Sequence, residues 1–541
     1  MRENSLIFLM RKGGIALGKL WFNGTFYTMQ TEGHSVDAIY TEKGKILKLG
    51  SKEELESWLE NQIYEVIDCS GGIVLPGFID SHMHLIGHGE SLKRVDLTQC
   101  HSYDEMISSM TEAVNQAKEN EWIIGEGWDE NQWQNTAEIH KKDLDNLSSA
   151  NPIVLKRACR HVYFVNSKVL EKAQLSEKTT IEGGQIGIDK NGKLNGLLYD
   201  EAVNAVLKAM PSPDEVYLTS ALETAIKDCW NHGIVGVVTE DLGYYGNALN
   251  VLKSFEKMLN RIPFFANLLI HHTVFEEIAP YLSNRSERLS FGGIKAFIDG
   301  SFGGRTALLS CPYQDNQSTN GLQVTSVQKL EEITKKAREH KVPVAFHMIG
   351  DLAVQQGIDV MLNFPNNSNL PDRLIHCELL SPTLVQKMKG LFAVIDIQSS
   401  FLFNDYPWLI DRVGEERNKY AFLIRTLLKE GLQLANGSDT PIDSINPWLG
   451  IYTSITRKAK NGIPYNIEES ISIYEALELY TTSGAVSIGL QGSKGQLKEG
   501  YDADFQFVSH DPYLIDTEEV INIKCIKTII REEIVFEKEW N

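Results

Sequence analysis

Short apolar runs alternate with amphipathic stretches through the middle of this chain, from about residue 73 to residue 436. This alternation is typical of βα units built around a parallel sheet. Eight strands are predicted, at residues 73–79, 234–239, 264–270, 294–298, 342–346, 373–375, 392–397 and 432–436. Helix-like stretches between them include residues 214–230, 326–340 and 416–428. The pattern predicts an α/β protein with a (β/α)8 (TIM) barrel, whose active site lies where the strands end.

The two ends of the chain have a different pattern of apolar and turn-forming residues. Short strand-like runs punctuated by turn residues occur between residues 20 and 50, and again between residues 495 and 530. We therefore expect residues 18–75 and 486–541 to pair into one small composite β-sandwich domain. The barrel would occupy residues 76–485, and residues 1–17 would be an appendage outside the core.

One segment is too long to be an ordinary connection between the first and second strands. About residues 100–212 lie between them, so we predict an inserted subdomain there. Insertions at this end of a barrel are placed to line or cover the active site.

Composition narrows the class of protein. The 541 residues carry a formal net charge of −20, which argues against nucleic acid or an anionic membrane as a partner. No uncharged run approaches the ~20 residues that a membrane helix needs. The seven dispersed cysteines indicate reduced thiols and a cytoplasmic setting. We expect a small-molecule substrate. Large barrels often self-associate, so a homo-oligomer is compatible with the sequence, which does not itself fix the oligomeric state.

Two histidines end the first predicted strand. His82 and His84 are one residue apart, so in an extended strand both side chains point to the same face and can share one metal ion. A pair of hydrogen-bonded structural histidines is the competing interpretation. The rest of the chain decides between the two.

Other strands end in groups that can also bind metal. The fourth contains Lys295 inside an apolar run, the fifth ends at His347, the sixth at His376, and the eighth is followed by Asp439. A buried lysine is unfavourable unless it is paired or chemically altered. Lys295 could instead form a Schiff base with a carbonyl substrate, but the four histidines would have no role in that chemistry. The combination favours a metal site.

These segments resemble the amidohydrolase superfamily, in the branch (amidohydrolase family 3) that includes N-substituted formamide deformylases. The matching segments are residues 76–84, 295–301, His347 with residues 350–351, residues 376–378, 437–441 and 500–505. The likeness extends from about residue 19 to residue 510, which is nearly the whole chain.

The resemblance implies a binuclear centre, with two zinc ions expected and iron or manganese as alternatives. Lys295 would be carboxylated on its amine and would bridge the two ions. The implied ligands are His82, His84 and Asp439 for one ion, and His347 and His376 for the other.

The implied reaction is hydrolysis of a non-peptide carbon–nitrogen bond, an amide, by a metal-activated hydroxide. Asp439 would act first as general base and then as general acid. One alternative is a deaminase, or a cyclic amide or ester hydrolase, that uses the same site. Another is a scaffold on the same fold that has lost catalysis. The sequence does not identify the substrate.

Five further residues match family positions near the pocket and are predicted to bind substrate: Trp128, Arg157, His161, Asp299 and Arg305. For the first three, packing of the subdomain's own core is the alternative. For Asp299 and Arg305 it is a glycine-rich loop held by a surface ion pair.

Overall fold

The computed structural model describes residues 18–538, apart from residues 61, 131–132, 134–138, 158–161, 182–183, 201, 284–285 and 407. Backbone contacts divide the chain into two compact units. One consists of the residues up to His88 together with those from Glu215 onward, and the other is Gly89–Asp214. The second unit contains the predicted insertion at about residues 100–212. The predicted domain borders at residues 75/76 and 485/486 stay predictions.

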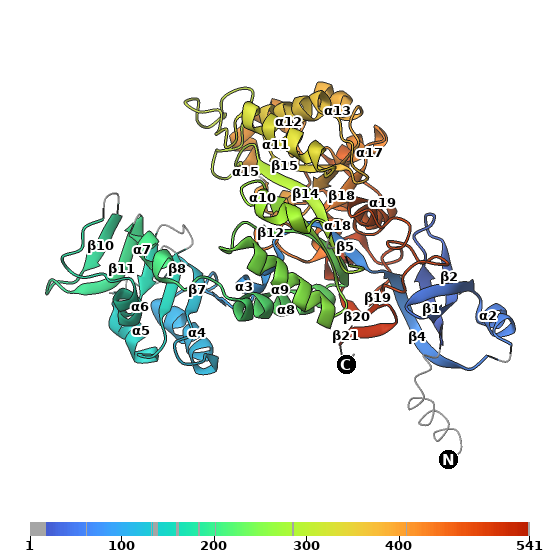
Figure 1. Cartoon of the computed structure of the whole chain (residues 1–541), viewed down its shortest axis with the longest axis horizontal. Helices are drawn as coiled ribbons and strands as arrows, with labels where there is room; N and C mark the ends of the chain where they lie inside the picture. Colours follow the sequence, from blue (N-terminus) through green and yellow to red (C-terminus); the bar gives the residue numbers. More distant parts are fainter. Residues whose placement is uncertain are drawn as a thin grey trace, which may run out of the picture. The chain divides into compact units, whose positions relative to one another are not determined.

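An eight-stranded sheet of parallel strands forms the barrel of the first unit (Figure 1). In sheet order the strands are β18 (Leu434–Asn436), β17 (Ala393–Ile397), β16 (Asp372–His376), β15 (Val344–Met348), β14 (Leu289–Phe297), β13 (Phe265–His271), β12 (Ile234–Leu242) and β5 (Phe78–Met83). The last and first strands meet just beyond their ends, where Asp439 N donates to His82 O at 2.8 Å and His84 N donates to Thr440 O at 2.9 Å. The predicted (β/α)8 barrel is confirmed.

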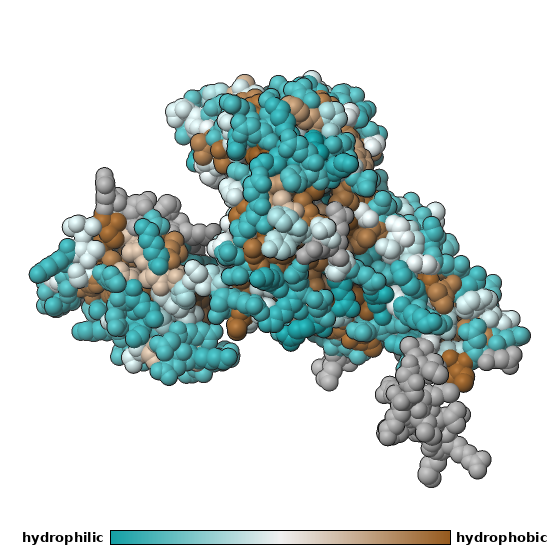
Figure 2. Space-filling model, in the orientation of Figure 1, coloured by the Kyte–Doolittle hydropathy of each residue, from teal (hydrophilic) through white to brown (hydrophobic). Residues whose placement is uncertain are grey.

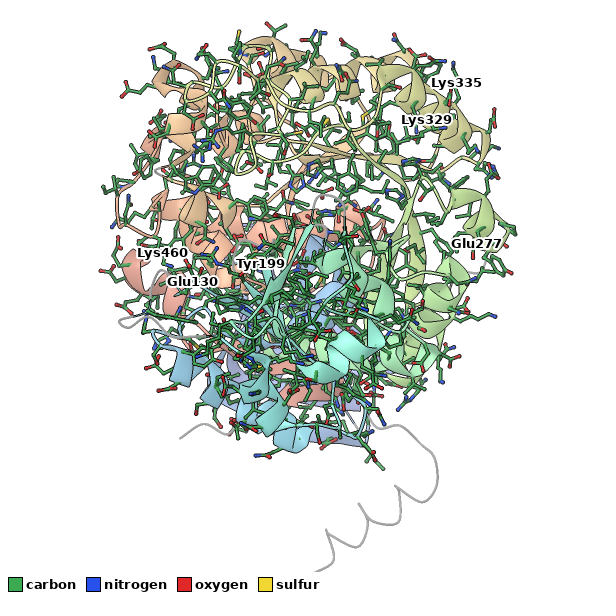
Figure 3. All side chains as sticks on the ribbon, turned by 90° about the vertical axis from the view of Figure 1, so that its left-hand side faces the viewer. Glu130, Tyr199, Glu277, Lys329, Lys335 and Lys460 are labelled. Atoms are coloured by element: carbon green, nitrogen blue, oxygen red, sulfur yellow. The ribbon has the colours of Figure 1, made fainter. Side chains whose placement is uncertain are left out.

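Helices follow the barrel strands and turn their apolar faces to the sheet. The helical segments of this part of the chain are α3 (Leu85–Ser91), α8 (Glu215–Asn231), α9 (Ala248–Arg261), α10 (Phe275–Ile278), η2 (Ala279–Tyr281), α11 (Val327–Glu339), α12 (Asp351–Asn363), α13 (Pro382–Met388), α14 (Phe401–Asp405), α15 (Trp408–Val413), α16 (Glu415–Asn418), α17 (Ile424–Lys429), α18 (Pro447–Thr456), η3 (Ile467–Glu469), α19 (Ile473–Tyr480), α20 (Thr482–Ser487) and η4 (Thr517–Asn522). In α11 the hydroxyl of Ser326 caps the first turn, and Leu330 and Ile333 are buried. Lys335 of α11 and Glu277 of α10 lie at the periphery (Figure 3).

Two predicted elements differ from the structure. The run at residues 73–79 is split, because Gly77 N donates to Asp504 O in the end sheet whereas Phe78 N donates to Gly233 O at the barrel. The stretch at residues 416–428 is not one helix. It breaks at Phe422, whose φ is 52° and whose N–H donates to Glu378 O instead of continuing a helical ladder.

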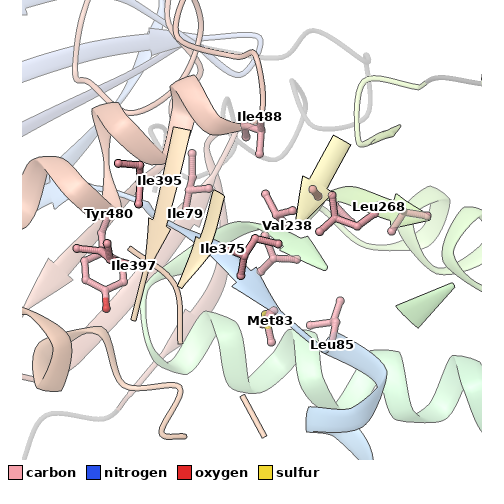
Figure 4. Close-up of a cluster of buried hydrophobic side chains, with 14 of the residues drawn as sticks. Ile79, Met83, Leu85, Val238, Leu268, Ile375, Ile395, Ile397, Tyr480 and Ile488 are labelled. Carbon is pink, nitrogen blue, oxygen red and sulfur yellow. The ribbon is translucent and has the colours of Figure 1, made fainter. Parts of the chain in front are cut away.

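The barrel's core is one continuous apolar cluster. It joins residues from strands far apart in sequence, among them Ile79, Val238, Leu268, Ile375 and Ile395 (Figure 4). β12 is buried at every position, as expected for a parallel strand covered on both faces. Each such fully buried aliphatic side chain contributes about 1.5–3 kcal/mol to folding.

The two ends of the chain share a seven-stranded sheet, as predicted. Its order is β21 (Glu533–Glu537), β20 (Cys525–Ile530), β19 (Phe505–Val508), β4 (Tyr64–Pro76), β1 (Gly18–Tyr27), β2 (Ser35–Glu42) and β3 (Lys45–Gly50), with α2 (Lys52–Trp58) after β3. The sheet curls back on itself, because Ile46 N donates to Tyr501 O and Gly500 N donates to Ile46 O. Trp21 and Phe505 pack edge to face inside it, with ring centroids 5.2 Å apart.

The second unit has its own six-stranded sheet, in the order β10-β11-β9-β8-β7-β6. Its elements are β6 (Val95–Asp96), α4 (Tyr103–Gln116), β7 (Ile123–Trp128), α5 (Lys141–Leu147), β8 (Ile153–Arg157), β9 (Val162–Val165), α6 (Ser167–Lys172), β10 (Gly184–Ile188), β11 (Leu194–Asp200) and α7 (Val203–Ala209). Separate apolar clusters lie on this sheet, one of them built around Leu155 and Phe164.

The face drawn in Figure 2 is mostly hydrophilic, with apolar residues exposed in small groups. Among the described residues, none of the helices combines the length and apolar character needed to cross a bilayer.

Candidate metal centre

Three predicted ligands meet where β5 and β18 end. Asp439 Oδ1 lies 3.6 Å from His82 Nε2 and 3.4 Å from His84 Nε2. His82 and Asp439 are almost completely buried, whereas His84 keeps part of its surface exposed. The His-x-His pair on the first strand and the aspartate after the eighth therefore converge as the sequence predicted.

A close backbone approach places Asp439 there. A Cβ on Gly437 would lie 2.5 Å from His82 N, so only glycine allows the eighth strand to pass this near the first. Asp80 joins the two segments, because its carboxylate accepts from the backbone N–H groups of His82 and Ser438. Asp439 itself has a φ of 55°, in the left-handed region that is unfavourable for a side chain and common at functional sites.

His376 and His347 lie side by side at the ends of neighbouring strands, with ring centroids 4.4 Å apart. The Nδ1 of His376 faces Gln398 Oε1 at 2.6 Å, and the Nε2 of His347 faces the Gly300 carbonyl at 3.0 Å. An acceptor at one ring nitrogen holds the proton there and leaves the other nitrogen as a lone-pair donor. His84 is arranged likewise, with Nδ1 2.8 Å from the Glu240 carbonyl.

Lys295 reaches the same place from the middle of the barrel. Its Nζ lies 2.5 Å from Glu240 Oε2 and 3.5 Å from His82 Nε2, and all three side chains are buried. The face of Phe297 covers the ammonium, with 4.6 Å between Nζ and the ring centroid. The structure thus brings Lys295 to the histidines, and adds Glu240 as its partner.

Burial sets the charge states of the imidazoles. It drives the pKa of His82 and His376 well below the ordinary value, and the pKa of His347 to about 4, with Lys295 adding to each effect. His84 differs: burial lowers its pKa, but the nearby Asp439 carboxylate outweighs burial and raises it to about 9. Neutral imidazole is the form that binds metal.

The donor set fits a divalent metal. Asp439 Oδ1 and His82 Nδ1 are buried and have no hydrogen-bond partner, which is unfavourable unless another group satisfies them. Among the described residues, two trios place one ligand atom each within 4.8 Å of one another: His82 with His376 and Asp439, and His82 with His84 and Glu240. His347 is in neither trio, and reaches the cluster through its contact with His376.

The structure places Asp299 and Arg305 in supporting contacts. The Asp299 carboxylate accepts from the backbone N–H groups of Leu308, Ile349 and Gly350, and lies 3.7 Å from His347 Nε2. Arg305 makes a two-pronged ion pair with Asp315, at 3.1 and 2.8 Å. These contacts clamp the loop after β14, and substrate binding by either residue stays a prediction.

The candidates from the insertion lie within the second unit. Trp128 is buried in its core and stacks on Trp133 with ring centroids 5.8 Å apart. Arg157 pairs with Asp129 and Glu130, each at 2.8 Å. His161 lies outside the described residues. Their role in substrate binding also stays a prediction.

Sequence reasoning missed Glu240 and Gln398. The second strand was predicted to end at residue 239, one residue before Glu240, and the seventh at residue 397, one residue before Gln398. A carboxylate or amide directly after the apolar run of a barrel strand was the available signal, because strand ends carry the active site in this fold.

A cavity of about 700 Å³ lies beside the centre, lined in part by Phe297, His271, His272 and Lys329. Phe297 connects the cavity with the metal centre, because its ring lines the cavity and packs on His347 with ring centroids 4.9 Å apart. A volume of this order accommodates a small organic molecule.

The family model described as "Amidohydrolase family" matches residues 65–536. The chain is 41% identical over 525 residues to the amidohydrolase-family protein YtcJ of Bacillus subtilis (strain 168), covering 96% of this chain and 99% of YtcJ. It is 22% identical to the N-substituted formamide deformylase of Arthrobacter pascens, over 95% of this chain and 98% of that enzyme.

Among solved structures, a metal-dependent hydrolase from Pyrococcus horikoshii superimposes with a TM-score of 0.78 and 28% identity, covering 93% of this chain and 99% of the other. These matches extend over the barrel and the sheet built from the two chain ends. They agree with the resemblance that the strand-end motifs predicted, and the chain belongs to the amidohydrolase family.

Proposed function

We propose that this protein is a metal-dependent hydrolase that cleaves an amide, a non-peptide carbon–nitrogen bond, in a small molecule. The observation that carries the proposal is the convergence of His82, His84, His376 and Asp439 at one end of the barrel. We assign two divalent ions to the centre, zinc in the first instance. The family match and the name of the Arthrobacter relative support the reaction class.

A bound divalent ion would supply two things here: a lower pKa for a water molecule and polarisation of the substrate carbonyl. Asp439 then moves the proton. Its carboxylate lies at the centre, 3.4 Å from His84 Nε2, and in this position it can accept the proton that the attacking water loses. Asp439 next donates this proton to the departing nitrogen, which leaves as an amine.

We assign Lys295 as a carboxylated lysine. The neutral amine adds to carbon dioxide, forming an N–C bond as one C–O π bond breaks, and the nitrogen releases a proton. The product is a carbamate anion, which divalent ions stabilise. Burial of the lysine among three imidazole-bearing strand ends supports this assignment.

We place the substrate in the cavity lined by Phe297, whose ring packs on His347. The test is a screen of zinc-loaded protein against N-formyl and N-acyl amines, with hydantoins, lactones and amino-heterocycles as controls. Turnover of the amides supports the proposal. Turnover of only the amino-heterocycles, with release of ammonia, would make the protein a deaminase instead.

The Asp439→Asn variant tests the proton-transfer role. We expect it to retain its thermal unfolding temperature and to lose about 10²–10⁴-fold in kcat, the usual contribution of general acid–base catalysis. Asp359→Asn is a matched control, because Asp359 pairs with Lys387 on the surface. Near-normal turnover by Asp439→Asn contradicts the assignment.

A further inference from the structure

Glu240 is a fully buried carboxylate two residues before the end of the second barrel strand, β12. The ligands assigned above lie on or after the first, fourth, fifth, sixth and eighth strands. No ligand has been assigned to the second strand, which carries Glu240. Charged side chains are seldom fully buried without a partner or a metal. The position of Glu240 therefore requires an explanation.

Its contacts direct it into the metal centre. Oε2 faces Lys295 Nζ at 2.5 Å, and Oε1 accepts a hydrogen bond from the Tyr244 hydroxyl at 2.6 Å. One of its oxygens lies within 4.8 Å of ligand nitrogens of His82 and His84, which are themselves within that distance of each other. The backbone carbonyl of the same residue orients the His84 ring. Glu240 thus contacts the centre through both its side chain and its main chain.

If Glu240 were simply the counter-ion of Lys295, its contacts would be explained only while Lys295 carries a positively charged ammonium group. In the proposed working centre Lys295 is a carbamate, so two buried anions would face each other across the present 2.5 Å contact. Such a juxtaposition is strongly unfavourable without a cation between the groups. A divalent ion removes the conflict, because it attracts both anions and accepts imidazole and carboxylate ligands together.

We propose that Glu240, on the second strand, is a metal ligand. Its carboxylate pairs with Lys295 in the metal-free protein, and in the metal-bound protein it instead binds a divalent ion together with His82 and His84. The proposal rests on the proposed function and deepens it. With Glu240, Asp439 and a carbamate on Lys295, three anions nearly balance two dications, which buried ion sites require. Tyr244 holds the second oxygen of Glu240 and fixes the carboxylate's orientation.

The test compares Glu240→Asp with the wild-type protein. Aspartate keeps the charge that neutralises Lys295 in the metal-free protein, so the fold is preserved, but its side chain is one methylene shorter and withdraws the oxygen from the histidines. We expect zinc retained per chain after dialysis to fall by about half. We expect the affinity for the lost ion to fall more than ~100-fold, beyond the 10–100-fold typical of residues outside the ligand sphere.

Tyr244→Phe is the matched control, because it removes only the hydroxyl that orients Glu240 and should lose ~10-fold or less in affinity. The visible absorption spectrum of cobalt-substituted protein gives a readout independent of turnover, and should change in Glu240→Asp. Circular dichroism checks that each variant is folded.

The proposal would be overturned if a folded Glu240→Asp variant kept the wild-type zinc content and an unchanged cobalt spectrum. Glu240 would then be only a counter-ion of Lys295. A failure of the proposed function is seen separately, as wild-type protein that takes up neither zinc nor cobalt.

Discussion

Two buried ion pairs join barrel strands, and they differ in how completely their polar atoms are satisfied. Arg373 and Asp396 lie on the neighbouring strands β16 and β17, whereas Lys295 and Glu240 lie on β14 and β12, with β13 between them. Arg373 and Asp396 form a two-pronged pair, and the guanidinium also donates to the carbonyls of Ser81 and Ser487. Lys295 has Glu240 at ion-pair distance, and otherwise a long contact to His82 and the face of Phe297.

The difference distinguishes an ion pair that stabilises the barrel from one that belongs to the candidate metal centre. Arg373 connects four segments of the chain, because from its own strand its guanidinium bonds Asp396 and two backbone carbonyls. A competing ligand would therefore have to break several hydrogen bonds at once. Lys295 and Glu240 sit among histidines with unshared lone pairs, where a cation can replace one partner without disturbing the strands. Incomplete satisfaction of a buried pair thus marks the place where a ligand belongs.

Breaking the satisfied pair should have the largest effect on stability. Arg373→Met leaves Asp396 buried without its cation, and we expect the free energy of unfolding in urea to fall by about 3–5 kcal/mol. The double variant Arg373→Met with Asp396→Leu should recover most of this loss, because it removes both charges. A single variant as stable as the wild type would show that Arg373 is not scaffolding.

A second variant sharpens the comparison at the metal centre. Gln398→Met removes the oxygen that faces Nδ1 of His376, so the ring loses its orientation while the fold is kept. We expect zinc affinity, measured by competition with a chelator, to fall ~10–100-fold. Gln356→Met is the control, because the Gln356 side chain accepts a hydrogen bond from Gln323 at the surface. Equal affinities in the two variants would contradict an orienting role for Gln398.

A smaller effect is expected from an ion pair in the seven-stranded sheet. Asp502 bonds Lys494 at 3.0 Å and Lys45 at 2.7 Å; burial raises its pKa, but Lys494 and Lys45 outweigh burial and lower it. Its contribution to stability is therefore complete above the unfolded pKa of about 3.8 and is lost as pH falls through the folded pKa.

Asp502→Asn should lower the unfolding free energy by about 1 kcal/mol or less near neutral pH. The loss should shrink as the pH falls below about 3.8, as urea titrations at several pH values would show. A loss that stays constant down to pH 3 would rule out the ionic contribution of Asp502.

Much of the fold was predictable because its signal is local. Each barrel strand is an apolar run of its own, and β12 is apolar enough to be recognised alone. The helix at residues 416–428 was predicted from the same kind of local pattern and is wrong, because Phe422 bonds the loop after β16. A competing partner so far away in sequence leaves no trace in local periodicity.

The candidate site follows the same rule. His82, His84 and Asp439 stand directly at strand ends, so position alone indicated them. The contact between Lys295 and Glu240 depends on the register of strands two to four around the barrel, which sequence does not state. Likewise, Arg305 could not be assigned to Asp315, because that pair is set by the shape of a loop.

The antiparallel pairing of β19 with β4 has a consequence for how the chain is made. Gln506 pairs with Leu75, so the ribosome must synthesise the entire barrel before β4, which already pairs with β1, receives its second neighbour. Until then, one edge of the N-terminal strands has open backbone groups that another nascent chain can occupy. Loss of the stretch that carries β19 would leave that edge permanently uncovered and turn a well-formed barrel into a template for aggregation.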